Sequence, residues 1–390
     1  MTKNKLGLNT ICTHVGELKD EQFKGAVSPI YLATSYQFED VDVKRYPRYF
    51  NTPNQEFLSK KLAALEHSEA ALIFGSGMAA INAMFLTFLK AGDHIVVQNT
   101  LYGGTSNFIK EQLPKMGIDY TFTEGYAVSD FKNAIRPHTK LIHMETPSNP
   151  LLTITDIEGA VRLAKSQNII TTIDNTFASP VNQNPIDFGV DIVMHSATKY
   201  LGGHSDILAG ALMGSQERID AIWSVAKNLG GNLSDMTVWM LERSIKTLGL
   251  RVKAQNRNAK KLAKYLHKHP DVKKVHYPGL KSHPEYHLAK KQMHGFGGML
   301  SFELNDELDA KVFQKELKLI KSSMSLAGVE STMLSPHLTS HALLTQEERD
   351  KIGISNQLIR FSVGIESKDD LINDIEQAIK KTKESTKVYL

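Results

Sequence analysis

Short apolar runs alternate with amphipathic stretches through the middle of the chain. Between the runs, residues recur at helical spacing, as Leu58, Leu62 and Leu65 do. The apolar runs have few polar interruptions and cover residues 70–74, 94–98, 140–145, 169–174 and 191–196. Nearly continuous apolar strands separated by helices are typical of a parallel sheet covered on both faces. The pattern predicts an α/β fold, whose ligands bind beyond the carboxyl ends of the strands.

The two ends of the chain have different patterns. Residues 1–50 are poorly periodic, and we expect an arm that lies on another surface. A chain of 390 residues exceeds what a single core usually supports. We therefore expect a large, mostly parallel sheet domain over residues 51–243. A smaller α+β domain should follow over residues 244–390, where the apolar runs alternate with polar residues and the last helix packs Leu371, Ile372, Ile375 and Ile379 on one face.

Composition and charge exclude several classes of protein. The chain has 46 Lys and Arg and 42 Asp and Glu, so the formal charge of +4 does not favour nucleic acid as a partner. The 15 histidines are scattered without metal-ligand spacing, and no metal is expected. Cys12 is the single cysteine, which fits a reducing compartment. Without a signal peptide or a long apolar stretch, the expected location is the cytoplasm, with no membrane partner.

Two candidate groups follow predicted strands directly. Gly77 and Met78 stand between a strand and a helix, where backbone N–H groups and a helix N-terminus favour a phosphate, although a plain tight turn explains them as well. The glycines do not complete a dinucleotide-binding fingerprint. Asp174 ends the run "IITTID"; such a carboxylate is either a helix cap or a counter-ion for a cationic ring nitrogen.

A lysine and an arginine complete the candidate set. Lys199 lies in "HSATKYLGGHSD" (residues 195–206), after Ser196 and Thr198 and before a glycine pair, 202–203, expected to give room for a ligand. A lysine that forms a Schiff base needs a partly desolvated pocket. Arg360 lies in an apolar strand, where it binds a carboxylate or forms a structural ion pair. A phosphate cup, an acid, a lysine and a carboxylate clamp together indicate pyridoxal phosphate with an amino-acid substrate.

The sequence resembles the cysteine/methionine-metabolism family of pyridoxal-phosphate enzymes, the trans-sulfuration enzymes, over nearly its whole length. The matching stretches are "SGMAAI", "LYGGT", "ETPSNPL", "DNTF", "HSATKYLGGHSD", "SIKTLGLR", "HYPGL" and "IRFSVGIE". The resemblance implies the fold-type I architecture of aspartate aminotransferase-like transferases. It also implies elimination or replacement at Cγ, or elimination at Cβ, of sulfur-bearing or O-acylated four-carbon amino acids.

The resemblance also implies a role for each matching residue. Lys199 would hold the cofactor as a Schiff base and then move protons, and Asp174 would pair with the ring nitrogen. Tyr102 would stack on the ring and assist proton transfer. Other positions would bind the phosphate (Gly77, Met78, Ser196, Thr198), the ring hydroxyl (Asn149) and the substrate carboxylate (Arg360, with Ser325 close by).

A Tyr-x-Arg pair in the arm implies a second subunit. Tyr46 and Arg48 fit the family's pair that reaches the phosphate of a neighbouring subunit, although Pro47 replaces the usual serine. The protein itself is therefore an expected partner, as a homodimer that completes each active site and as a homotetramer built from two such dimers.

Two positions bear on the choice of substrate. Asn107 stands where related cystathionine enzymes usually carry an arginine, and Met324 stands where a glutamate is frequent. Both remove charge from the distal pocket, and an apolar tail, as in methionine, suits Met324. Asn107 resembles the homoserine-ester sulfhydrylases, and Gly104 replaces the cysteine frequent in methionine γ-lyases. We expect γ-elimination or γ-replacement by an enzyme that resembles methionine γ-lyase. The alternatives are cystathionine γ-synthase, cystathionine γ- or β-lyase and homoserine-ester sulfhydrylase. From another class, the alternative is a non-catalytic binding protein with this fold.

Overall fold

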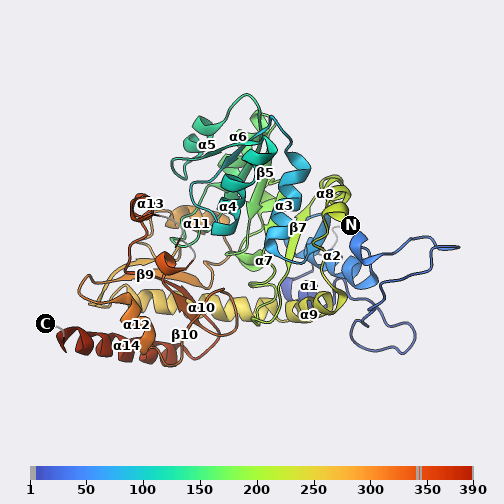
Figure 1. The fold of residues 1–390 in the computed structure, drawn as a ribbon. Helices are drawn as coiled ribbons and strands as arrows, with labels where there is room; N and C mark the ends of the chain where they lie inside the picture. The colour runs from blue at the N-terminus through green and yellow to red at the C-terminus, as the bar shows by residue number, and fades with distance from the viewer. Residues whose placement is uncertain (1–5, 340–341, 343–344, 389–390) are drawn as a thin grey trace.

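A seven-stranded sheet forms the centre of the molecule. The computed structural model describes residues 6–339, 342 and 345–388. It places the C-terminal third beside the large sheet (Figure 1). In spatial order, the strands are β1 (Ala70–Phe74), β7 (Gly210–Gly214), β6 (Ile192–His195), β5 (Ile170–Asp174), β4 (Thr139–Glu145), β2 (His94–Val97) and β3 (Asp119–Phe122).

The large sheet is parallel except for β7, which pairs antiparallel with both β1 and β6. The five runs expected from the sequence are all strands here, whereas β3 and β7 were not expected. β7 is the sequence "GALMG", whose glycines disfavour strand prediction. Gly210 is needed there because a Cβ would lie 2.1 Å from the carbonyl oxygen of Ser76.

Alternate residues of the central strands enter two separate apolar cores. Ile73 and Ile173 face one core, and Leu72 and Ile192 face the other. The first core is closed by α2 (Pro53–Glu66), α6 (Ile157–Ser166) and α9 (Asp235–Ile245), and the second by α3 (Gly77–Phe88), α4 (Gly103–Glu111) and α8 (Gln216–Leu229). Both faces of the sheet are thus covered, as its apolar strands require.

The first long helix begins where its capping residues place it. Thr52 accepts a hydrogen bond from the backbone N–H of Gln55, and the Gln55 side chain accepts one from the backbone of Thr52. Pro53 occupies the first helical position, where its missing N–H costs nothing. The helix expected from about residue 55 therefore starts two residues earlier.

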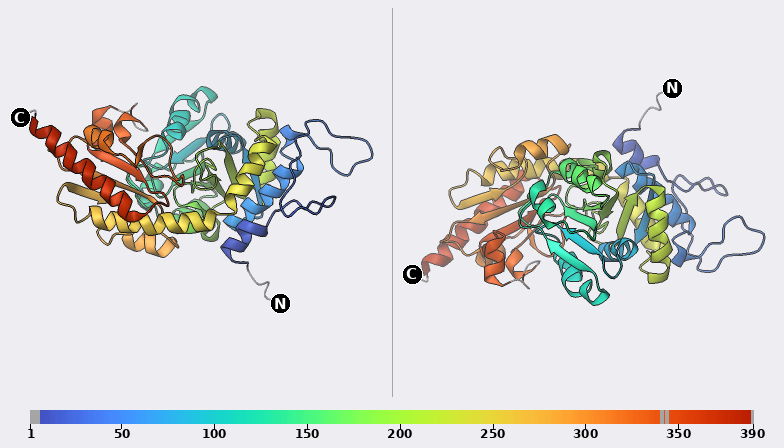
Figure 2. Two further views of the ribbon diagram at one scale, coloured as in Figure 1. Left: turned by 90° about the horizontal axis from the view of Figure 1, so that it is seen from below. Right: turned by 90° about the horizontal axis from the view of Figure 1, so that it is seen from above.

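A five-stranded sheet organises the C-terminal third. Its order is β10 (Lys321–Ser322), β11 (Thr332–Leu334), β12 (Leu358–Ser362), β9 (Met299–Leu304) and β8 (Val272–His276), and only β10 and β11 pair parallel. α10 (Leu248–Leu266) and α14 (Lys368–Val388) run along this sheet, as the left-hand view of Figure 2 shows. Leu371, Ile375 and Ile379 of α14 are buried in its core with Ile372 at the margin, as the sequence predicted.

The helix α10 connects the two parts of the molecule. Leu248 and Val252, near its start, lie in a core of the large sheet, and Leu262 and Leu266, near its end, lie in the core of the small one. The predicted division after residue 243 falls within α9 and stays a prediction.

Short elements complete the described chain, and none of its helices has the length and apolar character needed to cross a membrane. The remaining α-helices are α1 (Leu8–His14), α5 (Val128–Ala134), α7 (Ser179–Asn182), α11 (Tyr286–Gln292), α12 (Ala310–Glu316) and α13 (Gln346–Lys351). The 3₁₀ helices are η1 (Pro47–Tyr49), η2 (Pro114–Met116), η3 (Pro185–Phe188) and η4 (Pro336–Leu338).

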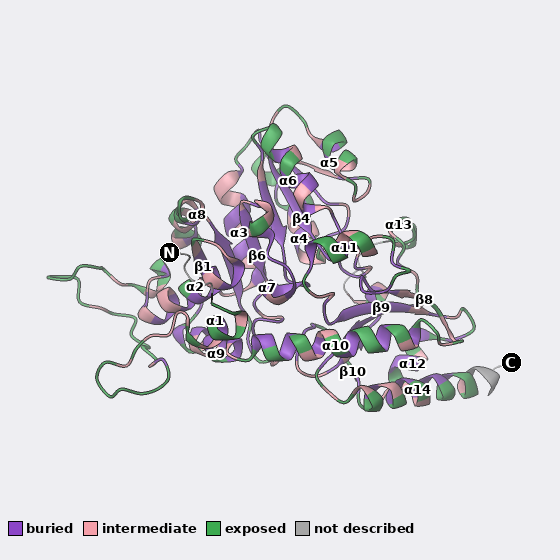
Figure 3. Ribbon diagram, turned by 180° about the vertical axis from the view of Figure 1, so that it is seen from behind, coloured by how far each residue is buried: buried purple, intermediate pink, exposed green. Residues whose placement is uncertain are grey.

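Residues 16–46 form long loops that extend away from the body (Figure 1). Most of this segment is coloured as exposed in Figure 3. Its exposed side chains include Phe23 (80%), Leu32 (61%) and Phe38 (66%). By contrast, α1 packs on the body before the loops begin, with Cys12 fully buried.

Candidate active site

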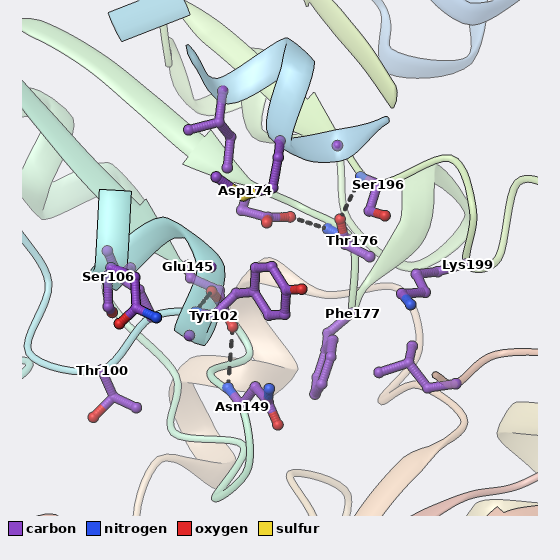
Figure 4. Close-up of a pocket in the computed structure, with 18 of the residues that line it drawn as sticks. Thr100, Tyr102, Ser106, Glu145, Asn149, Asp174, Thr176, Phe177, Ser196 and Lys199 are labelled. Carbon is purple, nitrogen blue, oxygen red and sulfur yellow. Dashed lines mark hydrogen bonds between the residues drawn. The ribbon is translucent and has the colours of Figure 1, made fainter. Parts of the chain in front are cut away.

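A cavity of about 1000 Å³ lies where the carboxyl ends of β4, β5 and β6 face the small sheet. Segments far apart in the sequence meet here, as the topology of a parallel sheet predicts. Twelve of the fourteen site residues expected from the sequence line it, and Figure 4 draws part of the set. These twelve are Gly77, Met78, Tyr102, Asn107, Asn149, Asp174, Ser196, Thr198, Lys199, Met324, Ser325 and Arg360.

The N-terminus of α3 forms one wall of the cavity. Ser76 caps the helix by accepting a 3.0 Å hydrogen bond from the Ala79 backbone N–H. Gly77 lies close against β6: a Cβ would meet Ser196 Cβ at 3.1 Å and Met194 Cε at 3.0 Å. The helix start can approach the strand this closely because the residue is glycine, and its N–H groups and dipole suit an anion.

The hydroxyl groups beside this wall have backbone partners. Thr176 Oγ1 accepts a 2.8 Å hydrogen bond from the Ser196 N–H, which ties the ends of β5 and β6 together (Figure 4). Thr198 Oγ1 donates to the Ala209 carbonyl at 3.2 Å and accepts from the Ala209 N–H at 3.1 Å. A phosphate contact from Thr198 would therefore require its hydroxyl to turn from Ala209.

Asp174 ends β5 with its carboxylate buried. One oxygen accepts a 2.9 Å hydrogen bond from the Thr176 N–H, shown as a dashed line in Figure 4. Burial raises the pKa of Asp174, while the Thr176 hydrogen bonds and the charges of His195 and Lys199 oppose that rise. A nearby cation stabilises the charged form of a carboxylate whose pKa is raised by burial, and a protonated ring nitrogen is such a cation.

Lys199 reaches the cavity from the turn after β6. Its Nζ donates a 2.7 Å hydrogen bond to Ser325 Oγ. Burial, and then the positive charge of Arg360, lower the pKa of Lys199 to about 8, although Asp174 acts in the opposite direction. A substantial fraction of the amine is therefore neutral slightly above pH 7, as a nucleophilic lysine requires.

The glycine pair after Lys199 does not give room to a ligand. Gly203 has φ +70°, and a Cβ on it would lie 1.8 Å from Arg251 Nη1; neither glycine of the pair lines the cavity. Arg251 is buried and donates to the carbonyls of Tyr200 at 2.9 Å and Ser244 at 2.9 Å. The expectation from the sequence was wrong because the close neighbour is this guanidinium, which comes from α10.

Arg360 approaches the same cavity from β12 of the small sheet. Its guanidinium is buried and donates to Asn149 Oδ1 at 3.1 Å and to the Ser325 carbonyl at 3.0 Å. Burial lowers the pKa of Arg360 to about 10, so the group remains charged at neutral pH. Among the described residues it forms no ion pair, although the charge of Glu145 acts on it, and its fork can accept a carboxylate in the cavity.

Glu145 is a site residue that the sequence reasoning missed. It ends β4 as Asp174 ends β5, and it accepts hydrogen bonds from the N–H groups of Tyr102 (2.7 Å) and Asn149 (3.2 Å). Burial, followed by the charge of Asp174, raises the pKa of Glu145 well above its usual value. The signal in the sequence was a carboxylate at the end of an apolar strand, "KLIHME", the same signal that identified Asp174.

Tyr102 projects among these groups (Figure 4). Its side chain is 48% exposed and lies against Gly104, where a Cβ would come within 2.6 Å of the tyrosine ring. A larger residue at position 104 would displace the ring. The ring position observed here thus depends on Gly104.

Tyr46 and Arg48 lie outside the cavity of their own chain. The Arg48 guanidinium lies 5.5 Å from the centre of the Tyr46 ring and donates to the Lys227 carbonyl at 2.6 Å. Both side chains are exposed at the base of the extended loops. They contribute nothing to this chain's own cavity.

Comparisons with known proteins agree with this geometry. The model of the Cys/Met metabolism PLP-dependent enzyme family matches residues 9–380. The chain belongs to this family. It is 42% identical over 370 residues to cystathionine β-lyase of Lactococcus lactis subsp. cremoris (94% of this chain, 97% of the relative). It is 39% identical over 396 residues to L-methionine γ-lyase of Fusobacterium nucleatum subsp. nucleatum (98% and 100%).

A solved structure agrees as well. Cystathionine γ-lyase from Lactobacillus plantarum, complexed with L-serine, superposes with a TM-score of 0.93 at 38% identity, covering 97% of this chain and all of the other. The fold is therefore the fold-type I architecture, and the protein is a pyridoxal-phosphate-dependent enzyme that acts on C–S bonds of amino acids. The buried Asp174, the Gly77 wall and the partly neutral Lys199 fit that cofactor.

Proposed function

We propose that the protein is a lyase that cleaves the thioether of cystathionine-like amino acids. The observation that carries the proposal is the pairing of Lys199 and Arg360 in one cavity, joined through Ser325. Ser325 accepts from Lys199 through its hydroxyl and from Arg360 through its carbonyl. Ser325 thereby bridges the amine for proton transfer and the guanidinium for the α-carboxylate.

Arg360 binds the substrate α-carboxylate, and its contact with Asn149 orients the fork toward the cavity. Lys199 holds the cofactor in the resting enzyme and takes the α-proton once the substrate is seated. For cleavage at Cγ, Lys199 also removes a proton from Cβ. Pyridoxal phosphate, when bound, supplies the electron withdrawal that makes the α-proton acidic.

The other groups hold the ring and the phosphate. Asp174 keeps the ring nitrogen protonated, and Tyr102 stacks on the ring. Gly77 and Met78 donate N–H groups to the phosphate, with the hydroxyls of Ser196 and Thr198 beside them. Asn149 approaches the ring hydroxyl. These roles rest on the family resemblance together with the placement of all seven residues in the lining of one cavity.

Two observations favour cystathionine over methionine. A cysteine in place of Gly104, frequent in methionine γ-lyases, would displace Tyr102. Met324, whose apolar side chain suggested a methionine tail, is 71% exposed and offers little buried apolar surface. Methionine is the second candidate, because a methionine γ-lyase is 39% identical to the chain.

A second copy of the chain completes each site in this proposal. The loops of residues 16–46 expose large apolar side chains that a monomer would not be expected to leave in water. Tyr46 and Arg48 stand at the end of these loops and would reach the phosphate bound by the partner. Two such dimers would form the tetramer.

The test is a substrate panel with the purified, cofactor-loaded enzyme. L-Cystathionine, L-methionine, L-cysteine and O-acyl-L-homoserines are offered with and without a thiol, and pyruvate, 2-oxobutyrate and new thioether are measured. We expect cystathionine to release a keto acid and to have the highest kcat/KM of the substrates in the panel. Thioether synthesis without keto acid would overturn the proposal in favour of a synthase or sulfhydrylase.

A further inference from the structure

The mouth of the cavity carries charged side chains that the reaction at Cα does not use. Lys110, Glu124 and Lys351 all line the cavity and are all exposed. Within the described residues, none of the three forms an ion pair. Asn107 and Met324 lie at the same exposed margin. The margin therefore has charge even though those two positions are neutral.

Lys110 lies on the face of α4 that borders the cavity. It follows Asn107 by three residues, so the two share a helix face. It is eight residues beyond Tyr102, about 12 Å along the helix axis, and helical side chains incline toward the N-terminus, here the end that carries Tyr102. Its Nζ lies 5.4 Å from the centre of the Phe122 ring, which also lines the cavity.

Glu124 comes from a neighbouring segment, two residues after β3. The loop is fixed by backbone contacts: the Thr123 N–H donates to the Val97 carbonyl at 2.8 Å, and Asn99 Nδ2 donates to the Glu124 carbonyl at 2.6 Å. Lys351 ends α13, in the C-terminal third of the chain. A carboxylate and an ammonium thus border the mouth from one part of the molecule, with a second ammonium from the other.

We propose that Lys110 and Glu124 are specificity-determining residues that bind the distal amino-acid group of the substrate. Lys110 binds the distal carboxylate and Glu124 the distal ammonium, while Lys351 adds positive charge to the margin. The pair takes the role of the arginine that related cystathionine enzymes carry at the position of Asn107. This inference rests on the proposed function and adds the residues by which the enzyme distinguishes one thioether substrate from another.

The chemistry requires both signs of charge. A thioether whose far end is itself an α-amino acid carries a carboxylate and an ammonium there, and a margin with both signs complements it. A methyl or ethyl tail has no group for either residue. Since the margin is exposed, each contact is worth about threefold to tenfold in kcat/KM, and salt weakens it.

The experiment compares thioethers that differ only at the far end. The identity of the keto acid released from L-cystathionine shows whether the cysteine or the homocysteine half is cleaved. The S-ethyl, S-(2-carboxyethyl) and S-(2-aminoethyl) derivatives of that half then supply no distal charge, a carboxylate alone and an ammonium alone. Wild type, Lys110→Met, Glu124→Gln and the control Lys115→Met are compared; Lys115 is exposed in η2 and does not line the cavity.

Lys110→Met is expected to lower kcat/KM for cystathionine and the carboxyethyl compound, relative to the ethyl compound, by about threefold to tenfold. Glu124→Gln should do the same for cystathionine and the aminoethyl compound. Lys115→Met should leave every ratio unchanged, and Lys110→Arg should retain the wild-type ratios. Ratios unaffected by Lys110→Met and Glu124→Gln would overturn the inference, whereas a wild type that cleaves no thioether would overturn the proposed function instead.

Discussion

The inner and outer parts of the cavity are built in different ways. In the inner part, Glu145, Asp174 and Arg360 are buried, and each has hydrogen-bond partners that fix its position. At the outer margin, Lys110 and Met324 are exposed and no hydrogen bond fixes their side chains within the described chain. The inner part thus has one geometry, set by the fold, and the margin can vary without disturbing it.

This difference separates reaction from specificity. Groups that act on Cα must be held within a narrow geometry, which buried hydrogen bonds provide. Groups that recognise the tail of the substrate contribute about 1 kcal/mol each from an exposed position. Substitutions in the two parts should therefore differ in the size and the kind of their effects.

The largest effect is expected from Lys199→Ala. Removal of the amine that moves the protons should lower kcat at least about 10³-fold. The far-ultraviolet circular dichroism spectrum, which reports secondary structure, should stay unchanged. Borohydride should fix the cofactor on the wild-type peptide that contains Lys199 and on no peptide of the variant. Substantial residual turnover would move the proton-transfer role to another group, with Tyr102 the next to test.

The second-largest effect is expected from Arg360→Lys. Lysine keeps the charge but loses the planar fork that can bind both carboxylate oxygens. The expected result is a rise in KM and a fall in kcat/KM of about 10-fold to 200-fold. The near-visible absorbance of the bound cofactor should stay as in the wild type, and loss of that absorbance would place Arg360 in cofactor binding instead.

Glu145→Gln tests the missed carboxylate. Two backbone N–H groups donate to its two oxygens, and glutamine turns an N–H₂ toward one of them. We expect the free energy of unfolding in urea to fall by about 1–3 kcal/mol, and kcat to fall more than KM rises because Tyr102 shifts. Wild-type kcat in this variant would show that the contact with Tyr102 does not position the ring.

Cofactor capture should depend on pH through Lys199. The pKa of about 8 means that the neutral amine gains population as pH rises through that value. The rate at which apoenzyme captures pyridoxal phosphate should rise about tenfold between pH 7 and pH 9. Stopped-flow absorbance measures it; a rate independent of pH over this range would contradict the assignment.

The smallest effect is expected from Met324→Ala. The side chain is 71% exposed, so its loss should alter kcat/KM for methionine and for cystathionine less than about threefold. Steady-state kinetics with both substrates give the comparison. A loss above tenfold that is confined to methionine would restore the apolar-tail interpretation of this residue.

The sequence predicted the inner part better than the margin, for a physical reason. Lys199, Asp174 and Arg360 are polar residues in or beside apolar strands, and such positions are unusual enough to be noticed in one dimension. Glu145 follows the same rule and could have been found. Gly203 could not, since its constraint is the Arg251 guanidinium packed against it. Lys110 and Glu124 belong to the site only because α4 and the end of β3 lie side by side at the mouth.

Arg360 stands on β12 of the small sheet, whereas Asp174 ends β5 of the large sheet and Lys199 follows β6 in a turn. Groups that would hold the cofactor therefore come mainly from the large sheet, whereas the reaction needs side chains from both sheets. If the small sheet opened while the large one stayed folded, Lys199 and Asp174 would remain in place and the bound cofactor would still absorb near the visible, but the carboxylate clamp would be lost. Absorbance of the bound cofactor would then report on the large sheet alone, and turnover would report on both sheets.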